Sequence, residues 1–124
     1  IHYIGFVEDA EIPHLYKQAV ALVMPTYFSP TNIPPLEAFV VGCPVLYSDS
    51  AGLREQVGDA ALMLDLKNPE SMCQNLLKIM ESPSEAGMLV KKGKRKIGSL
   101  MKVDHLKGLM GVFDDYSVKL KTWK

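Results

Sequence analysis

A stretch in the first third of the chain, residues 25–39, has the residue types and spacing to hold an anionic ligand. It follows an apolar run of strand length at residues 19–24 and leads into an apolar segment that ends at Gly42. We interpret this pattern as a buried strand, a polar turn and the start of a helix. Backbone N–H groups at such a helix start, together with the helix dipole, bind phosphate. Glu37 falls near the first turn of that helix, within reach of a ligand held by the turn.

The rest of the chain alternates strand-like and helix-like segments before it becomes helical. The strand-like runs are residues 3–7, 20–24, 44–48 and 62–65, and the helical patterns are residues 10–18, 35–41, 68–81, 82–101 and 104–121. Such alternation predicts an α/β fold, with a Rossmann-like parallel sheet of about four strands, flanking helices and a helical C-terminal half. We expect Asp9 to cap the first helix and Gly42 to end the second.

The turn and its flanks resemble the signature of retaining glycosyltransferases of family 4, also called group 1, which have the GT-B fold. The residues that match the signature are Pro34, Leu36, Glu37, Gly42, Pro44 and Val45. Further matches are Gly5, Val7, Asp9, Glu11, Leu15 and Tyr16 before the turn, and Gly52 and Glu55 after it. The resemblance implies that residues 1–124 form a single domain, a partial GT-B carboxyl-terminal domain, which is the half of the enzyme that binds the nucleotide-sugar.

The resemblance also implies a role for each residue of the turn. Glu37 matches a glutamate that holds the nucleotide's ribose, and a carboxylate can accept hydrogen bonds from two hydroxyls at once. The N–H groups of Asn32 and Ile33 would face the pyrophosphate, with Thr31 as a further donor. The loop that the family places near the nucleotide base corresponds to Gly5 and Phe6.

Two parts of the turn depart from the family's pattern. Ser29 stands where the family has a glutamate that contacts the transferred sugar, and a serine hydroxyl can hydrogen-bond there without a charge. Residues 30–32 replace a Gly-Phe-Gly sequence. Glu37 and Ser29 are therefore the candidate catalytic residues, and Ser29 is expected to alter the donor preference or weaken the activity.

Simpler interpretations stand beside these roles. Asn, Thr and Pro are ordinary turn formers, and residues 5–6 fit an ordinary strand–helix turn. Glu37 can be a carboxylate that only interacts favourably with the helix dipole. Two other functions stay open for the whole chain. One is a non-catalytic binding or assembly module of GT-B ancestry, and the other is a related GT-B nucleotide-sugar enzyme such as an epimerase or a sugar phosphorylase.

The chain resembles only the later strands of the family's sheet, which suggests a piece of a longer protein that lacks the first strands and the amino-terminal domain. We expect residues 3–7 to pair directly with residues 20–24 through a right-handed crossover. The alternative is an exposed sheet edge covered by a second copy, which gives a homodimer. The family's phosphate-neutralising Arg and Lys residues lie on the absent strands, so we expect this chain alone to be inactive and to bind nucleotides weakly.

The composition excludes several classes of function. Fourteen basic and fourteen acidic residues balance, so the net charge gives no argument for nucleic acid binding. The two cysteines have no ligand-like spacing, and we expect no metal and no cofactor besides the substrate, a nucleotide-sugar such as a UDP- or GDP-sugar. Two cysteines without a disulfide-like pattern fit a reducing compartment, so we expect a cytoplasmic protein. No apolar run approaches the roughly 20 residues that cross a bilayer. The acceptor would be a glycan or a lipid-linked molecule, and the basic run at residues 91–96 is either a solvated helix face or a peripheral contact with the inner face of the membrane.

Overall fold

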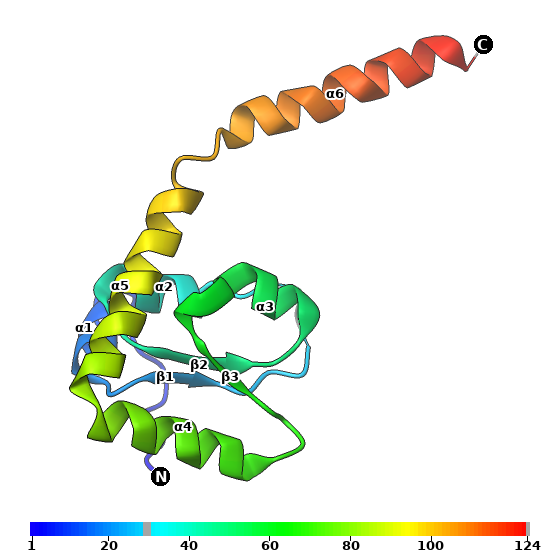
Figure 1. Ribbon diagram of the computed structural model, residues 1–124. Coiled ribbons are helices and arrows are strands. Elements are labelled where there is room, and N and C mark those ends of the chain that lie inside the picture. Colours follow the sequence, from blue (N-terminus) through cyan, green and yellow to red (C-terminus); the bar gives the residue numbers. More distant parts are fainter. Residues whose placement is uncertain (29–30, 124) are drawn as a thin grey trace.

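The computed structural model describes residues 1–28 and 31–123 and confirms an α/β fold built on a parallel sheet (Figure 1). The strands are β1 (Leu22–Met24), β2 (Val45–Ser48) and β3 (Leu62–Leu64), which lie in the order β1-β2-β3. The helices are α1 (Ile12–Gln18), α2 (Pro34–Val41), α3 (Ala51–Val57), α4 (Pro69–Glu81), α5 (Pro83–Leu100) and α6 (His105–Thr122), with a short 3₁₀ turn, η1 (Gly58–Ala60).

The central strand, β2, is buried along its whole length, as a parallel strand covered on both faces should be. Its side chains alternate between two layers of core because successive residues of a strand point to opposite faces. Val45 and Tyr47 join the cluster formed with α2 and α3. Leu46 joins the opposite cluster, which α4 and the first half of α5 complete with Ile79 and Leu89. Packing in these two core layers places the first turns of the helices at the carboxyl end of the sheet, where ligands of open α/β folds bind.

Helix α2 begins and ends as its sequence predicts. Pro34 and Pro35 occupy its first positions, where a missing N–H costs no intrahelical bond. Gly42 ends the helix with φ +85°, a left-handed conformation that glycine adopts without a Cβ clash. The Gly42 N–H donates to the Ala38 carbonyl at 2.9 Å, which satisfies one of the last carbonyls of the helix.

The basic run at residues 91–96 lies on α5, and three of its side chains contact residues of α3 and η1. Lys92 Nζ and Arg95 Nη2 lie 3.2 and 3.5 Å from Asp59 Oδ2 in η1. The hydrogen bond from Lys92, aided by the charge of Arg95, lowers the pKa of the Asp59 carboxyl. Lys96 Nζ donates to the Glu55 carbonyl at 3.2 Å. Part of this run therefore ties α5 to the rest of the domain, and contact with lipid stays a prediction.

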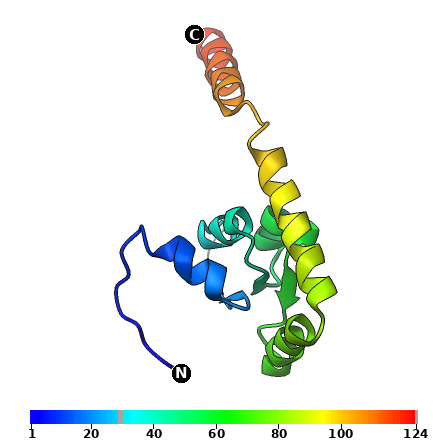
Figure 2. The ribbon, with the colours of Figure 1, turned by 90° about the vertical axis from the view of Figure 1, so that its left-hand side faces the viewer.

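The amino-terminal segment is where the sequence prediction was wrong. Residues 3–7 form no strand and make no pairing with residues 20–24, and they run as an extended segment beside the body of the protein (Figure 2). In the part of the chain that the structure describes, the sheet consequently has three strands rather than about four. Helix α1 begins at Ile12, two residues later than predicted, with Glu11 rather than Asp9 at the N-cap position. A β-rich run needs a neighbouring strand to satisfy its backbone, and among the described residues only β2 pairs with β1.

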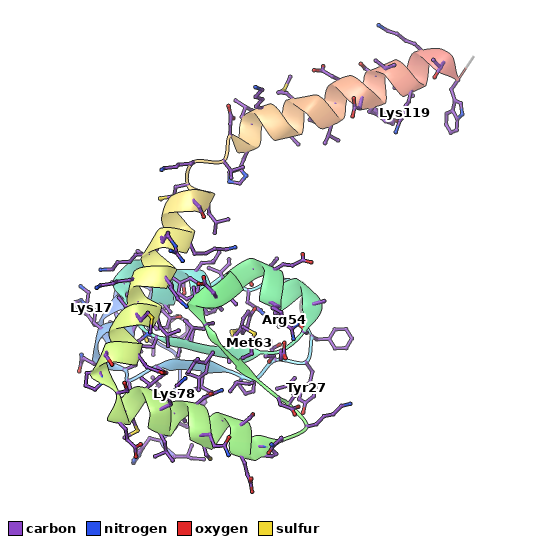
Figure 3. The ribbon with its side chains drawn as sticks, in the orientation of Figure 1. Lys17, Tyr27, Arg54, Met63, Lys78 and Lys119 are labelled. Atoms are coloured by element: carbon purple, nitrogen blue, oxygen red, sulfur yellow. The ribbon has the colours of Figure 1, made fainter. Side chains whose placement is uncertain are left out.

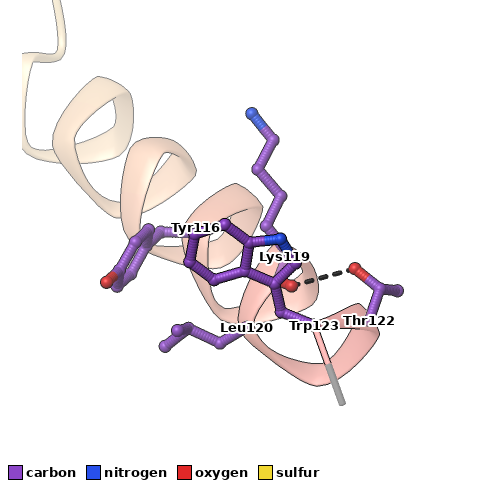
Figure 4. Close-up of a pocket in the computed structure, with 5 residues that line it drawn as sticks. All are labelled: Tyr116, Lys119, Leu120, Thr122 and Trp123. Atoms are coloured by element: carbon purple, nitrogen blue, oxygen red, sulfur yellow. Dashed lines mark hydrogen bonds between the residues drawn. The ribbon is translucent and has the colours of Figure 1, made fainter.

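The last helix, α6, projects from the body and buries none of its side chains (Figure 1). Asp104 caps its start by accepting a hydrogen bond from the Lys107 N–H at 2.9 Å. Its large apolar side chains, among them Leu106, Leu109 and Phe113, face solvent. A shallow hollow near its end is lined by Tyr116, Lys119, Leu120, Thr122 and Trp123, and the Thr122 hydroxyl donates to the Lys119 carbonyl at 2.9 Å (Figure 4).

Candidate functional site

The turn between β1 and α2 offers fewer hydrogen-bond donors than its sequence suggested. Pro34 and Pro35 have no N–H, and the N–H groups of Leu36 and Glu37 turn back onto the Ile33 carbonyl at 2.8 and 3.1 Å. Within the described residues, the Ile33 N–H has no acceptor. This N–H lies at the positive end of an eight-residue helix, where an anion is favoured. Among the described residues of the turn, the N–H of Ile33 is therefore available to an anion at this helix start.

Asn32, the second predicted phosphate donor, already has partners. Its N–H donates to Gln56 Oε1 at 3.2 Å, and its carbonyl accepts from Gln56 Nε2 at 2.6 Å. Its side-chain amide donates to the Tyr47 hydroxyl. An anion at the Asn32 N–H would have to displace Gln56 from it.

Tyr47 and Gln56 are residues that sequence reasoning missed. In the sequence, Tyr47 lies within the strand-like run at residues 44–48, and Gln56 lies outside the predicted strands and helices. A hydroxyl in a central strand must find a partner when it is buried, and this was the available signal. Tyr47 is fully buried, and its hydroxyl donates to Gln56 Oε1 at 3.1 Å.

Glu37 lies in the first turn of α2, as predicted, and its side chain is exposed. Its Oε2 accepts a hydrogen bond from the Tyr16 hydroxyl of α1 at 3.2 Å. Burial, reinforced by the bond to Glu37 and by the charge of that carboxylate, raises the pKa of Tyr16 to about 12. Tyr16 thus stays a protonated donor at neutral pH and holds the carboxylate in one orientation.

Glu37 and Tyr16 line a groove of about 430 Å³ between α1 and α2. Its other lining residues are Asp9, Ile12, Pro13, Val40 and Val41. The groove is apolar along the helices and acidic at Asp9 and Glu37. It can accommodate a small molecule that presents hydroxyl groups to a carboxylate.

The remaining predicted site residues are spread over other places. Gly5 has φ +69°, and Phe6 is 86% exposed and lines a different hollow from Glu37. Thr31 is exposed beside Asn32. Ser29 lies outside the described residues. The structure therefore brings Asn32, Ile33 and Glu37 to one helix start and leaves Gly5 and Phe6 on the extended segment.

Other polar side chains gather where the strands end. Tyr27, after β1, donates its hydroxyl to the Leu66 carbonyl at 3.1 Å, and Arg54 of α3 pairs with Asp49 after β2 (Figure 3). In residues 1–28 and 31–123, no three His, Cys, Asp or Glu side chains come together as metal ligands would.

Loss of the Tyr16 hydroxyl should reduce stability in a pH-dependent way. In Tyr16→Phe we expect the free energy of unfolding to fall by about 0.5–1.5 kcal/mol at neutral pH, the usual worth of one hydrogen bond. The Tyr16 pKa rises from 10.0 to about 12 on folding, so the stability from its hydroxyl is complete below pH 10 and is lost as the pH rises through 12. Urea denaturation of both proteins along this pH range would measure the difference, which should shrink with rising pH. A difference that stays constant would contradict the assignment.

Comparison with known proteins decides the family. The model of the family described as glycosyl transferases group 1 matches residues 1–96. The chain belongs to this glycosyltransferase family. The resemblance seen in the sequence, to the carboxyl-terminal part of a GT-B glycosyltransferase, is thereby confirmed.

Two curated glycosyltransferases and one solved structure illustrate the relationship. The O-antigen chain mannosyltransferase B of Escherichia coli is 34% identical over 84 residues, which are 68% of this chain and 22% of that protein. An uncharacterised glycosyltransferase of Methanocaldococcus jannaschii is 28% identical over 97 residues, or 77% of this chain and 25% of that protein. A sucrose-phosphate synthase structure from Thermosynechococcus elongatus superposes with a TM-score of 0.77 and 21% identity, over 96% of this chain and 30% of that one.

This member of the glycosyltransferase family thus spans about a quarter of the length of the curated relatives it matches. The structural likeness supports the fold. Among the helices formed by the described residues, none has the length and the apolar character that a membrane crossing requires.

Proposed function

We propose that this chain is the donor-binding part of a retaining glycosyltransferase. The whole protein would transfer a sugar, of hexose type, from a nucleotide-sugar to a glycan, polysaccharide or lipid-linked acceptor. The carrying observation is that an exposed carboxylate, Glu37, and the N–H of Ile33, which has no acceptor among the described residues, lie within one turn of the same helix start. The similarity to a mannosyltransferase favours a hexose as the transferred sugar.

Each group has a definite task in this proposal. Glu37 accepts hydrogen bonds from both ribose hydroxyls, and Tyr16 keeps one carboxylate oxygen in place for it. The Ile33 N–H and the positive end of α2 stabilise the negative charge that develops on the leaving diphosphate. Ser29, which lies outside the described residues, is proposed to contact the transferred sugar on the resemblance alone.

The chain by itself is proposed to have no measurable transferase activity and only weak nucleotide affinity. Among the described residues, its turn contributes few N–H donors, because two prolines follow Ile33 and the Asn32 N–H already donates to Gln56. The same observation favours the second candidate function, a binding module that kept the fold and lost the chemistry. Release of sugar from a nucleotide-sugar by the isolated chain would contradict the proposed inactivity.

A titration with UDP and with GDP, followed by backbone amide NMR, tests the site. We expect the shifts to cluster at residues 32–37, and Glu37→Ala to weaken binding about 10- to 100-fold, because hydrogen bonds to a charged group are worth roughly 1.5–3 kcal/mol. Glu70→Ala is the matched control, since Glu70 is also an exposed carboxylate in the first turn of a helix that begins with proline. The unmodified protein should bind the 2′-deoxy nucleotides more weakly than the ribonucleotides. Glu37→Ala should bind both kinds of nucleotide with the same affinity. Equal effects of the two alanine substitutions would contradict the proposed role of Glu37.

A further inference from the structure

Gln56 of α3 makes a two-point contact with the main chain of the turn. Its side-chain amide accepts from the Asn32 N–H at 3.2 Å and donates to the Asn32 carbonyl at 2.6 Å. A primary amide carries a donor and an acceptor in one plane, so it pairs with Asn32 as one strand pairs with another. The contact joins segments that are 24 residues apart in the sequence.

Tyr47, in the core, hydrogen-bonds to both residues of this contact. Its hydroxyl donates to Gln56 Oε1 at 3.1 Å and accepts from the Asn32 side-chain amide. Tyr47 is fully buried, and no buried polar side-chain atom among the described residues lacks a partner. Hydrogen bonds that form such a network in a region of low dielectric constant polarise and strengthen one another. The three side chains therefore hold the Asn32 main chain in one position.

The position of Asn32 determines the direction of the next N–H. The Asn32 carbonyl and the Ile33 N–H belong to one planar trans peptide, so they point in opposite directions and turn together. Gln56 Nε2 fixes that plane when it donates to the carbonyl. The same bond draws electron density toward the carbonyl oxygen and makes the Ile33 N–H a stronger donor.

We propose that Gln56, braced by Tyr47, is a positioning residue for the diphosphate of the nucleotide-sugar, because it aims and polarises the Ile33 N–H. This inference rests on the proposed function, in which that N–H binds the leaving diphosphate. Gln56 does not contact the ligand in this arrangement. It acts through one peptide group, so its loss should weaken the diphosphate contact and leave the ribose contact at Glu37 intact.

The test compares Gln56→Met, which keeps the length of the side chain and removes its hydrogen-bonding groups, with Gln74→Met on the exposed surface of α4. We expect Gln56→Met to weaken UDP or GDP binding about tenfold and to reduce the ligand-induced shift of the Ile33 amide. Its preference for the ribonucleotide over the 2′-deoxy nucleotide should stay unchanged. Tyr47→Phe, which keeps the ring in the core, should show a smaller loss of the same kind, and thermal unfolding checks that each variant is folded.

The outcomes separate the two proposals. Equal affinities in Gln56→Met and Gln74→Met would overturn the role of Gln56 while the donor site stands. If Gln56→Met loses both its affinity for the nucleotide and its preference for the ribonucleotide, Gln56 has a merely structural role. That result would overturn the inference as well. If the unmodified chain binds neither nucleotide, the proposed function fails and the inference fails with it.

Discussion

Truncation of Phe39 to alanine is expected to lower the free energy of unfolding by about 3–5 kcal/mol. Phe39 lies on α2, is 2% exposed, and belongs to the core cluster that β2, α2 and α3 share. Removal of its ring leaves a cavity in that cluster, and the packed neighbours can close it only in part. Because small domains have a total stability of roughly 5–15 kcal/mol, Phe39→Ala should sharply raise the unfolded fraction.

Urea denaturation followed by circular dichroism would measure this loss. Val40→Ala is the matched control, since Val40 is the next residue of the same helix and is 60% exposed. We expect that substitution to change the stability by less than about 0.5 kcal/mol. Similar losses in the two variants would show that Phe39 does not occupy the core as described.

Gly93→Ala is expected to destabilise the protein by about 1–3 kcal/mol, although alanine favours a helix over glycine by about 1 kcal/mol. Gly93 lies inside α5, where that helix crosses α2, and it is buried. A Cβ at this position would lie 2.6 Å from Cδ1 of Phe39, with Cγ and Cβ of the same side chain at 3.0 and 3.3 Å. The contact is with a ring held in the core, so the helices must move apart to admit the methyl group.

Gly98 provides the matched control on the same helix. A Cβ there meets no heavy atom within 4 Å, so Gly98→Ala should stabilise the protein by up to about 1 kcal/mol. Combination of Gly93→Ala with Phe39→Leu should cost less than the sum of the single changes, because the smaller side chain makes room for the methyl group. Thermal melts of the four variants and the unmodified protein would test both signs, and a stabilising Gly93→Ala would contradict the close packing of α2 and α5.

This packing matters for the candidate site because α2 carries it. Glu37 and the Ile33 N–H are at the first turn of the helix whose inner face holds Phe39. Substitutions of Phe39 or Gly93 should therefore reduce nucleotide binding in proportion to the unfolded fraction. Substitution of Glu37, which is exposed, should reduce binding without a comparable loss of stability.

Much of the fold could be predicted from local patterns. The three strands of the sheet, the prolines that begin α2, α4 and α5, and Gly42 at the end of α2 all lie where periodicity and capping chemistry place them. Residues 3–7 were mispredicted because a β-rich run becomes a strand only beside a partner strand. The homodimer through the free edge of β1, the lipid contact and the cytoplasmic location stay predictions.

By itself, the sequence determined the class of fold, the family and the place of Glu37 at the first turn of α2. Those features depend on local propensity and on residue spacing along one segment. Only the tertiary structure decided that Tyr16 holds Glu37, that Gln56 occupies Asn32, and that Gly93 gives room to Phe39. Each of these pairs joins segments more than 20 residues apart, and their contact depends on how helices pack over the sheet. The hydrogen-bonding groups of the turn were therefore visible in the sequence. The contacts that occupy the Asn32 N–H, and that leave the Ile33 N–H without an acceptor among the described residues, were not.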